Sequence, residues 1–291
     1  MDDLIQDGRA LLGESDGVAR RDFIKVTLGG GFALAALPVA AQSVIHTDSA
    51  GLTAGTVNVV VDGQSVPVYR AQPEGGSNLP VVLVVSEIFG VHEHIADVVR
   101  RFARLGYLAL APDLFVRQGD PAKVASVAAL MSGIIAKTPD GQVLADLDAV
   151  LAWAGAHGGN ADKAAITGFC WGGRITWLYA AHNPRLKAAV AWYGRLVGEA
   201  TPLAPRQPID IAADLTVPVL GLYGGKDGGI PQESIDRMKA ALAKGHSKSA
   251  FVVYPQAGHA FNADYRASYV AAAAQDGFAR CLAWFKENGV I

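Results

Sequence analysis

A cysteine lies at the centre of the run Gly-Phe-Cys-Trp-Gly-Gly at residues 168–173. The run Ala-Ala-Ile-Thr at 164–167 precedes it and an apolar-periodic segment at 175–181 follows it, which predicts a strand, a sharp turn and a helix. Glycines two places to either side of Cys170 leave room for a strained backbone that lifts one side chain out of a sheet. This pattern is typical of a nucleophile elbow, so the sequence predicts a thiol nucleophile at Cys170.

Two further residues could complete a catalytic set with this thiol. Asp227 lies in Gly-Gly-Lys-Asp-Gly-Gly after one predicted strand, and His259 lies in Ala-Gly-His-Ala-Phe after the last predicted strand. A histidine can take the proton of a thiol, and a carboxylate can accept the other ring N–H and hold the tautomer. The chain order of nucleophile, acid and histidine is that of the α/β-hydrolases. Asp210 and Asp214 are weaker alternatives for the acid because they precede the strand.

Acyl transfer also needs two N–H donors for the developing oxyanion. One is the N–H of the residue after the nucleophile, Trp171, and the other should come from the loop after an earlier strand. In this chain that loop is Ser-Glu-Ile-Phe-Gly at 86–90, and we choose Ile88 as the second donor. Glu87 in the same loop is unexpected, because a carboxylate close to a thiol opposes formation of the thiolate.

The same residues also allow other interpretations. Cys170 could be a structural cysteine in a glycine-rich turn, and the chain could be a non-catalytic ligand-binding protein that has the fold of an enzyme. A thiol redox protein is a third alternative, but the sequence has no Cys-x-x-Cys pair. The second cysteine, Cys281, lies in an apolar-periodic segment and is expected to be a small buried side chain. A disulfide between the two would consume the proposed nucleophile, so we favour a cysteine-dependent hydrolase.

The composition fits a globular protein with a large apolar core. Hydrophobic residues make up 51% of the 291 residues and charged residues 18%. A net charge of −2 at pH 7 gives no basic footprint for nucleic acid or for an anionic membrane. Histidines and cysteines are not clustered at ligand spacing, so we expect no metal and no cofactor. We expect a monomer.

The first 41 residues match the pattern of a twin-arginine export signal. Arg20-Arg21 precede an uncharged Gly, Ala and Leu-rich stretch at 26–41 that ends in small residues, as cleavage requires. The stretch is shorter than the roughly 20 residues that a membrane span needs. We therefore expect a periplasmic or secreted protein that uses the twin-arginine export machinery, with a short linker at 42–51. An uncleaved membrane anchor and a buried N-terminal helix are the alternatives, and three consecutive glycines at 29–31 oppose the helix.

Strands and helices alternate from residue 52 onward, which predicts one α/β domain over 52–291, with a mostly parallel sheet and helices on both faces. The domain begins with a hairpin whose strands, 57–61 and 65–69, are joined by an Asp-Gly turn. The continuous apolar run 80–85 is typical of a strand buried on both faces. Further strands are predicted at 107–111, 164–167, 188–192, 217–223 and 250–254. Helices are predicted at 95–105, twice within 123–153, after the cysteine, at 232–243 and at 265–286.

Five motifs, in order, resemble those of the dienelactone hydrolase (carboxymethylenebutenolidase) family. They are Ser-Glu-Ile-Phe-Gly-Val-His, Ala-Pro-Asp-Leu-Phe-Val-Arg-Gln, Gly-Phe-Cys-Trp-Gly-Gly, Gly-Gly-Lys-Asp and Ala-Gly-His-Ala-Phe, and the resemblance runs from about residue 55 to the C-terminus. It implies an α/β-hydrolase fold and hydrolysis of a carboxylic ester or lactone without a cofactor. It also implies that Cys170, Asp227 and His259 form the catalytic set. In the family a glutamate, here Glu87, partners the resting thiol and gives way when substrate enters.

In this family two arginines bind the carboxylate of the substrate, and this chain lacks both at the corresponding positions. One of them would fall on Ala263, and the other has no clear counterpart between residues 123 and 137. Arg117 and Arg266 are the candidates that could supply the positive charge instead. We therefore expect a small lactone or ester as substrate, with dienelactone as one candidate, in a mainly apolar pocket. Besides Arg117, the side chains expected to line that pocket are Phe89, Phe115, Trp171, Trp192, Tyr193 and Phe261.

Overall fold

The computed structural model describes residues 45–291, whose strands form one mixed sheet. The eight strands lie in the order β1-β2-β4-β3-β5-β6-β7-β8. Strands β3 to β8 run parallel, while β1 and β2 form a hairpin whose second strand pairs antiparallel with β4. The mostly parallel α/β sheet that the sequence predicts is therefore confirmed. The strands are β1 (Leu52–Val61), β2 (Gln64–Pro73), β3 (Leu79–Val85), β4 (Leu108–Pro112), β5 (Gly159–Phe169), β6 (Ala188–Trp192), β7 (Val219–Gly224) and β8 (Ala250–Tyr254).

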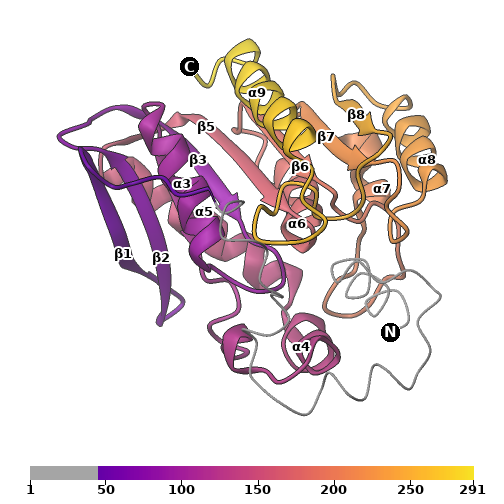
Figure 1. Ribbon diagram of the computed structural model, residues 1–291, viewed down its shortest axis with the longest axis horizontal. Coiled ribbons are helices and arrows are strands. Elements are labelled where there is room, and N and C mark those ends of the chain that lie inside the picture. Colours follow the sequence, from indigo (N-terminus) through magenta and orange to yellow (C-terminus); the bar gives the residue numbers. More distant parts are fainter. Residues whose placement is uncertain (1–44) are drawn as a thin grey trace.

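Helices cover both faces of the sheet, because each parallel strand needs a crossover to return the chain to the same edge. Figure 1 shows α3 and α9 in front of the sheet and α5 and α6 behind it. Every residue of β4 and of β6 is buried between these layers. The helices are α3 (Glu93–Arg104), α4 (Val127–Gly133), α5 (Asp140–Ala156), α6 (Trp171–His182), α7 (Pro208–Ile211), α8 (Gln232–Leu242) and α9 (Ala271–Glu287), with short 3₁₀ turns η2 (Pro121–Lys123), η3 (Ile135–Lys137) and η4 (Ala212–Asp214).

The predicted last helix begins too early. The sequence pattern places its start at Tyr265, but α9 begins at Ala271. Between them the chain forms consecutive turns, in which the N–H of Arg266 donates to the carbonyl oxygen of Ala263 and that of Tyr269 to Arg266. The aromatic and charged residues here face the interior from a loop, so apolar spacing alone does not distinguish this segment from a first helical turn.

The N-terminal predictions are only partly covered by the structure. The predicted export signal at 1–41 lies outside the described residues, so it stays a prediction, together with the expected location and export partner. The described chain begins within the predicted linker, and β1 starts at its end, at Leu52. Within residues 45–291, no helix has both the length and the apolar character needed to cross a bilayer.

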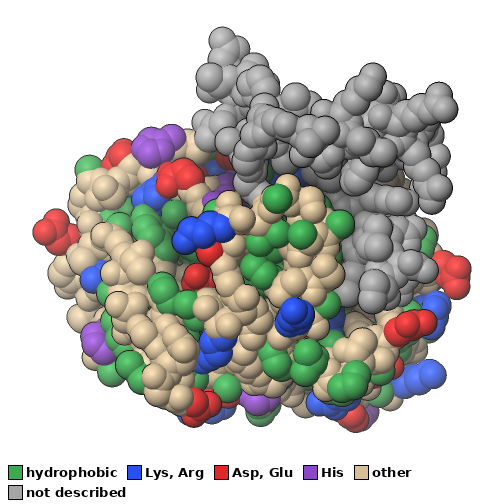
Figure 2. Space-filling model, turned by 90° about the horizontal axis from the view of Figure 1, so that it is seen from below, with side chains coloured by type: hydrophobic (Ala, Val, Ile, Leu, Met, Phe, Trp, Pro, Cys, Tyr) green, Lys and Arg blue, Asp and Glu red, His purple; other side chains and the backbone are tan. Residues whose placement is uncertain are grey.

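Charged side chains of both signs are interspersed on the described surface that Figure 2 shows. Exposed pairs such as Arg185 with Asp162 and Arg280 with Asp276 bring opposite charges together. A protein that follows a nucleic-acid backbone presents a stripe of one sign instead. The visible surface therefore agrees with the small net charge of −2.

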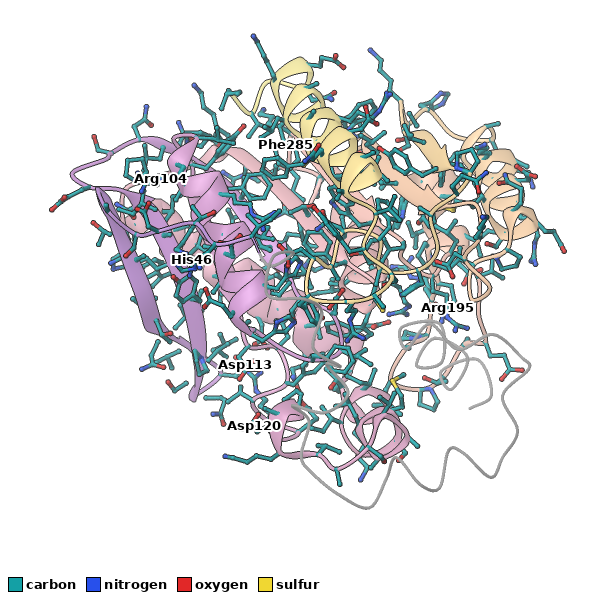
Figure 3. All side chains as sticks on the ribbon, in the orientation of Figure 1. His46, Arg104, Asp113, Asp120, Arg195 and Phe285 are labelled. Atoms are coloured by element: carbon teal, nitrogen blue, oxygen red, sulfur yellow. The ribbon has the colours of Figure 1, made fainter. Side chains whose placement is uncertain are left out.

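The carboxyl ends of the parallel strands place the loops that carry chemistry at one edge of the sheet. Figure 3 shows Asp113, directly after β4, and Arg195, after β6, on this side, whereas Phe285 of α9 lies toward the opposite side. The predicted nucleophile, acid and histidine follow β5, β7 and β8 respectively. The topology therefore brings all three to the same edge.

Candidate active site

Cys170 lies at the junction of β5 and α6, where the chain turns sharply. Its backbone has φ +55° and ψ −117°, a conformation that a residue with a Cβ rarely adopts, and its N–H donates to the Trp192 carbonyl oxygen at 3.0 Å. The flanking glycines permit this close packing. A Cβ on Gly168 would lie 2.3 Å from the Gly172 oxygen, and one on Gly172 would lie 2.4 Å from the Val85 oxygen. The strained turn predicted from the glycine spacing is confirmed.

Asp227 and His259 form a hydrogen-bonded pair. Nδ1 of His259 lies 2.7 Å from Oδ2 of Asp227, and both side chains are buried. An ionised carboxylate only accepts hydrogen bonds, so we assign the proton of this bond to Nδ1. Oδ1 of Asp227 accepts a second bond from the backbone N–H of Gly229 at 3.0 Å. The loop after β7 therefore fixes the carboxylate, and the carboxylate orients the imidazole.

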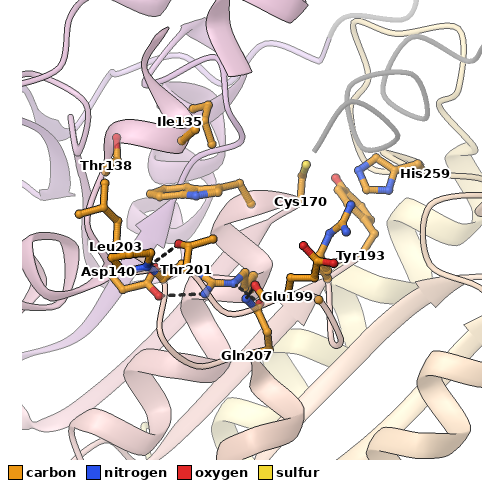
Figure 4. Close-up of a pocket in the computed structure, with 17 residues that line it drawn as sticks. Ile135, Thr138, Asp140, Cys170, Tyr193, Glu199, Thr201, Leu203, Gln207 and His259 are labelled. Atoms are coloured by element: carbon orange, nitrogen blue, oxygen red, sulfur yellow. Dashed lines mark hydrogen bonds and ion pairs between the residues drawn. The ribbon is translucent and has the colours of Figure 1, made fainter. Parts of the chain in front are cut away.

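His259 also interacts with Cys170. Burial lowers the pKa of His259, but the charges of Asp227 and Cys170 outweigh this effect and raise the pKa well above its ordinary value. A hydrogen-bonding interaction with the Cys170 side chain also contributes to this raised pKa, and Nε2 of His259 is buried. Figure 4 shows both side chains at one pocket. An imidazolium that favours a nearby thiolate is what an activated cysteine requires.

Two backbone N–H groups are available close to the elbow. That of Trp171 is the first of α6, and that of Ile88 lies in the loop after β3, the strand that pairs with β5. Neither donates to a carbonyl oxygen of the described chain. Uncommitted N–H groups at a helix start and in a neighbouring loop can stabilise a developing negative charge. The assignment of Trp171 and Ile88 as oxyanion donors stays a prediction.

Glu87 is fully buried in the same loop as Ile88. Its Oε2 accepts a hydrogen bond of 2.6 Å from the Tyr265 hydroxyl and lies 3.9 Å from Nε2 of His92, whereas Oε1 has no hydrogen-bond partner in the described chain. Burial raises the pKa of Glu87, but His92 and Arg266 outweigh burial and lower the pKa to about 2. Glu87 is therefore a carboxylate at neutral pH. Its bond to Tyr265 differs from the expected partnership with the resting thiol.

Neither Arg117 nor Arg266, the two arginines that the sequence offers as carboxylate binders, is among the residues that line the pocket beside Cys170, although the charge of Arg266 interacts with that of Cys170. The guanidinium carbon of Arg266 lies 4.6 Å from the ring centre of Phe89 and 4.9 Å from that of Tyr265, both cation–π distances. Arg117 donates two hydrogen bonds to Asp146, at 2.6 and 2.8 Å. Phe89, which the sequence analysis also assigns to the pocket, lies with Arg266 and does not line it.

The pocket beside the thiol has a volume of about 440 Å³. Cys170, Trp171, Tyr193 and His259 line the end that holds the thiol, so the structure places two of the predicted pocket residues, Trp171 and Tyr193, in its wall. The Tyr193 hydroxyl is buried and has no hydrogen-bond partner in the described chain. The remaining lining residues, several of them labelled in Figure 4, are Ile135, Ala136, Thr138, Asp140, Arg174, Arg195, Gly198, Glu199, Thr201, Pro202, Leu203, Ala204 and Gln207.

The other aromatic residues that the sequence assigns to the pocket are buried in the core instead. Phe115 is fully buried, with its ring centre 4.7 Å from that of Trp171. The rings of Trp192 and Phe261 lie 5.9 Å apart, and Nε1 of Trp192 donates to the Thr167 hydroxyl at 3.1 Å. Phe115, Trp192 and Phe261 therefore support the site and do not line the pocket.

The sequence analysis does not identify most of the pocket wall. This wall comes from the loop 195–207, between β6 and α7, and from residues 135–138. Loops longer than about 12 residues without secondary structure are usually functional in compact domains, and this length is the signal that the sequence does carry. Tyr265 is missed as well, because the sequence pattern assigns it to a helix.

Cys170 and Cys281 are both thiols, and no disulfide joins them. Cys281 is fully buried in α9, and burial raises its pKa, as expected for a small core side chain. Within the part of the chain that the structure describes, no three His, Cys, Asp or Glu side chains are grouped as metal ligands would be.

The chain is similar to known proteins over most of its length. The model of the dienelactone hydrolase family matches residues 66–289. A "Putative carboxymethylenebutenolidase" of Methylorubrum extorquens is 57% identical over 275 residues, which cover 94% of each chain. A protein of the same name from Escherichia coli K12 is 56% identical over 264 residues, covering 90% of this chain and 97% of its own length. A crystal structure titled "Putative Dienelactone Hydrolase", from Klebsiella pneumoniae, superposes with a TM-score of 0.80 at 56% identity and covers 81% of this chain and 99% of its own.

Proposed function

The chain belongs to the dienelactone hydrolase family of carboxylic ester and lactone hydrolases, and we propose that it cleaves its substrate through a thioester on Cys170. One observation carries this proposal: the thiol lies on a strained elbow at the pocket end where His259, held by Asp227, also lies. The elbow places Cys170 in the wall of the pocket, where a substrate carbonyl could reach the sulfur, and the raised pKa of His259 favours the thiolate. Small esters and lactones, dienelactone among them, are the substrate classes that this chemistry serves.

The reaction has two halves, acylation and deacylation. His259 gives up a proton in the first half and regains one in the second. The Cys170 thiolate attacks the carbonyl carbon and forms a C–S bond, while the N–H groups of Trp171 and Ile88 stabilise the oxyanion. As the C–O bond breaks, the His259 imidazolium gives its proton to the departing alkoxide. Water then attacks the thioester, His259 takes a proton from that water, and the C–S bond breaks to restore the thiolate.

A variant without the nucleophile tests the proposal. We expect Cys170→Ala to lower turnover of p-nitrophenyl acetate by about 10³-fold or more, because the covalent route is lost. The wild-type protein, quenched during turnover, should carry an added acyl mass on the peptide that contains Cys170. Cys281→Ala is the matched control, since it removes the other thiol and should keep its activity. Turnover by Cys170→Ala at the wild-type rate, with circular dichroism unchanged, would exclude the proposed nucleophile.

A further inference from the structure

We propose that the pocket beside Cys170 selects uncharged substrates, so that the natural substrate is a neutral ester or lactone with an apolar body and not a carboxylate-bearing molecule such as dienelactone. This inference rests on the proposed function, since the same pocket holds the nucleophile. It concerns the charge of the substrate and leaves the reaction unchanged.

Apolar side chains form much of the pocket wall. Ile135, Trp171 and Leu203 contribute the large surfaces, and Pro202 and Ala204 lie beside Leu203 in the same loop. Figure 4 shows Ile135 and Leu203 on the side of the pocket away from His259. A carboxylate next to such a wall loses hydration and gains no partner, whereas an alkyl or ring carbon gains burial.

One of the two guanidinium groups that line the pocket, that of Arg174, is already hydrogen-bonded within the protein. Arg174 donates two hydrogen bonds to Asp140, at 2.7 and 2.8 Å, which makes a bidentate pair. It also donates to Oε1 of Gln207 at 2.7 Å and to the carbonyl oxygen of Arg206 at 2.9 Å. Arg174 and Asp140 are both buried. A substrate carboxylate would have to displace Asp140, which would leave a buried anion without its partner.

The uncharged polar side chains of the wall make hydrogen bonds to nearby backbone groups. The Thr138 hydroxyl donates to the Ile134 carbonyl oxygen at 2.9 Å, and the Thr201 hydroxyl accepts from the N–H of Ala204 at 3.0 Å. The amide nitrogen of Gln207 donates to the Glu199 carbonyl oxygen at 3.1 Å. The bonds of Thr201 and Gln207 lie within the loop 195–207, and that of Thr138 lies within the segment before α5, so these bonds serve the fold of the wall.

The remaining charges in the wall balance in sign. Arg195 and Glu199 both line the pocket, one cation and one anion, as Arg174 and Asp140 do. A carboxylate-bearing substrate would therefore enter a pocket whose wall provides no net positive charge.

A matched pair of substrates tests the inference. We expect kcat/KM for p-nitrophenyl butyrate to exceed that for mono-p-nitrophenyl succinate by about 100-fold at pH 7, because the two differ chiefly in a terminal carboxylate. A γ-ethyl and a γ-carboxymethyl butyrolactone should show the same order. Equal values, or a preference for the anions, would overturn the inference. If neither member of either pair is turned over, the proposed function fails, and protection of Cys170 from iodoacetamide by butyramide against succinamate decides the charge preference independently.

A charge placed in the wall should reverse part of this preference. Leu203 is partly exposed and lines the pocket, so Leu203→Lys should bring an ammonium group to the apolar side without displacing Arg174. We expect the ratio of neutral to anionic kcat/KM to fall by about tenfold in this variant. Leu203→Met, of similar length and no charge, is the control and should keep the wild-type ratio. A lysine variant with the ratio of the methionine variant would contradict the inference.

Discussion

Two buried charged clusters lie near Cys170, and they differ in how completely their charged groups are hydrogen-bonded. In the pocket wall, Arg174 makes four hydrogen bonds, two of them to Asp140. In the loop after β3, Glu87 accepts one bond from Tyr265 on Oε2, while Oε1 has no partner in the described chain. The charged groups of both clusters, Arg174, Asp140 and Glu87, are buried, so the difference does not come from solvent exposure.

The comparison separates a structural charge from a functional one. A bidentate pair with every contact made holds two segments together, here the start of α5 and the elbow helix α6. A buried carboxylate oxygen without a partner is rare, because its desolvation is not offset by a bond. Glu87 also lies next to Ile88, a candidate oxyanion donor, so we interpret its unpartnered oxygen as functional. We therefore expect changes in the first cluster to affect stability and changes in the second to affect reactivity and pH dependence.

The largest expected effect is on the Arg174 cluster. Arg174→Ala leaves the Asp140 carboxylate buried without its partner, so it should lower the free energy of unfolding by about 3–5 kcal/mol, measured by urea denaturation. Arg174→Met combined with Asp140→Asn removes both charges together and should recover most of that loss. If Arg174→Ala unfolds at the wild-type urea concentration, the pair is not structural and the comparison fails.

Glu87→Gln should mainly change how the free energy of unfolding depends on pH. The pKa of Glu87 falls from its ordinary 4.5 to about 2 in the folded protein, so its charge stabilises the fold above pH 4.5, and this contribution is lost as the pH falls through about 2. The wild type should therefore lose on the order of 3 kcal/mol relative to Glu87→Gln between these pH values, in paired urea titrations.

The same variant should also change the reactivity of the thiol. Removing the anion favours a thiolate at Cys170, so iodoacetamide should react with it at lower pH than in the wild type. Glu93→Gln is a suitable control, because Glu93 is an exposed carboxylate at the start of α3. Parallel pH dependences of stability for wild type and Glu87→Gln would show that Glu87 is not held as an anion.

The parts of the site that the sequence predicts are those that a local sequence pattern positions. Cys170, Asp227 and His259 each follow a parallel strand, so strand order and glycine-rich turns are enough to bring them to one edge. The hairpin, the alternation of strands and helices and several helix bounds follow from local sequence patterns in the same way. Glu87 is recognisable because a carboxylate in an oxyanion loop conflicts with thiolate formation.

Arg174, Asp140 and Tyr265 are not recognisable in this way. Arg174 and Asp140 lie 34 positions apart and meet through the packing of α5 against α6. Tyr265 reaches Glu87 across 178 positions from an irregular loop. No local pattern encodes contacts of this kind, because they depend on how the loops at the sheet edge pack over one another. The pocket wall and its charge balance therefore become visible only in three dimensions.

The smallest expected effect is that of Tyr265→Phe. This variant tests whether Tyr265 acts through Glu87 or only stabilises the fold, as Arg174 does. Phenylalanine keeps the ring beneath Arg266 and removes only the hydroxyl that donates to Oε2 of Glu87. A hydrogen bond to a charged group contributes about 1.5 kcal/mol or slightly more, so the loss of unfolding free energy at pH 7 should be of that size. Because that bond favours the charged form, acid destabilisation should also begin at a higher pH than in the wild type.

A double-mutant cycle shows whether Tyr265 acts through Glu87. If it does, Tyr265→Phe should cause a clearly smaller change in the Glu87→Gln background, and the two single effects should not add. A merely structural tyrosine would give equal losses in both backgrounds and no shift of the acid limb. Tyr269→Phe, in the same loop four residues later, serves as the matched control and should leave the acid limb unchanged. Additive effects would place Tyr265 with Arg174, among the groups that hold the fold, and would leave Glu87 without a positioning residue.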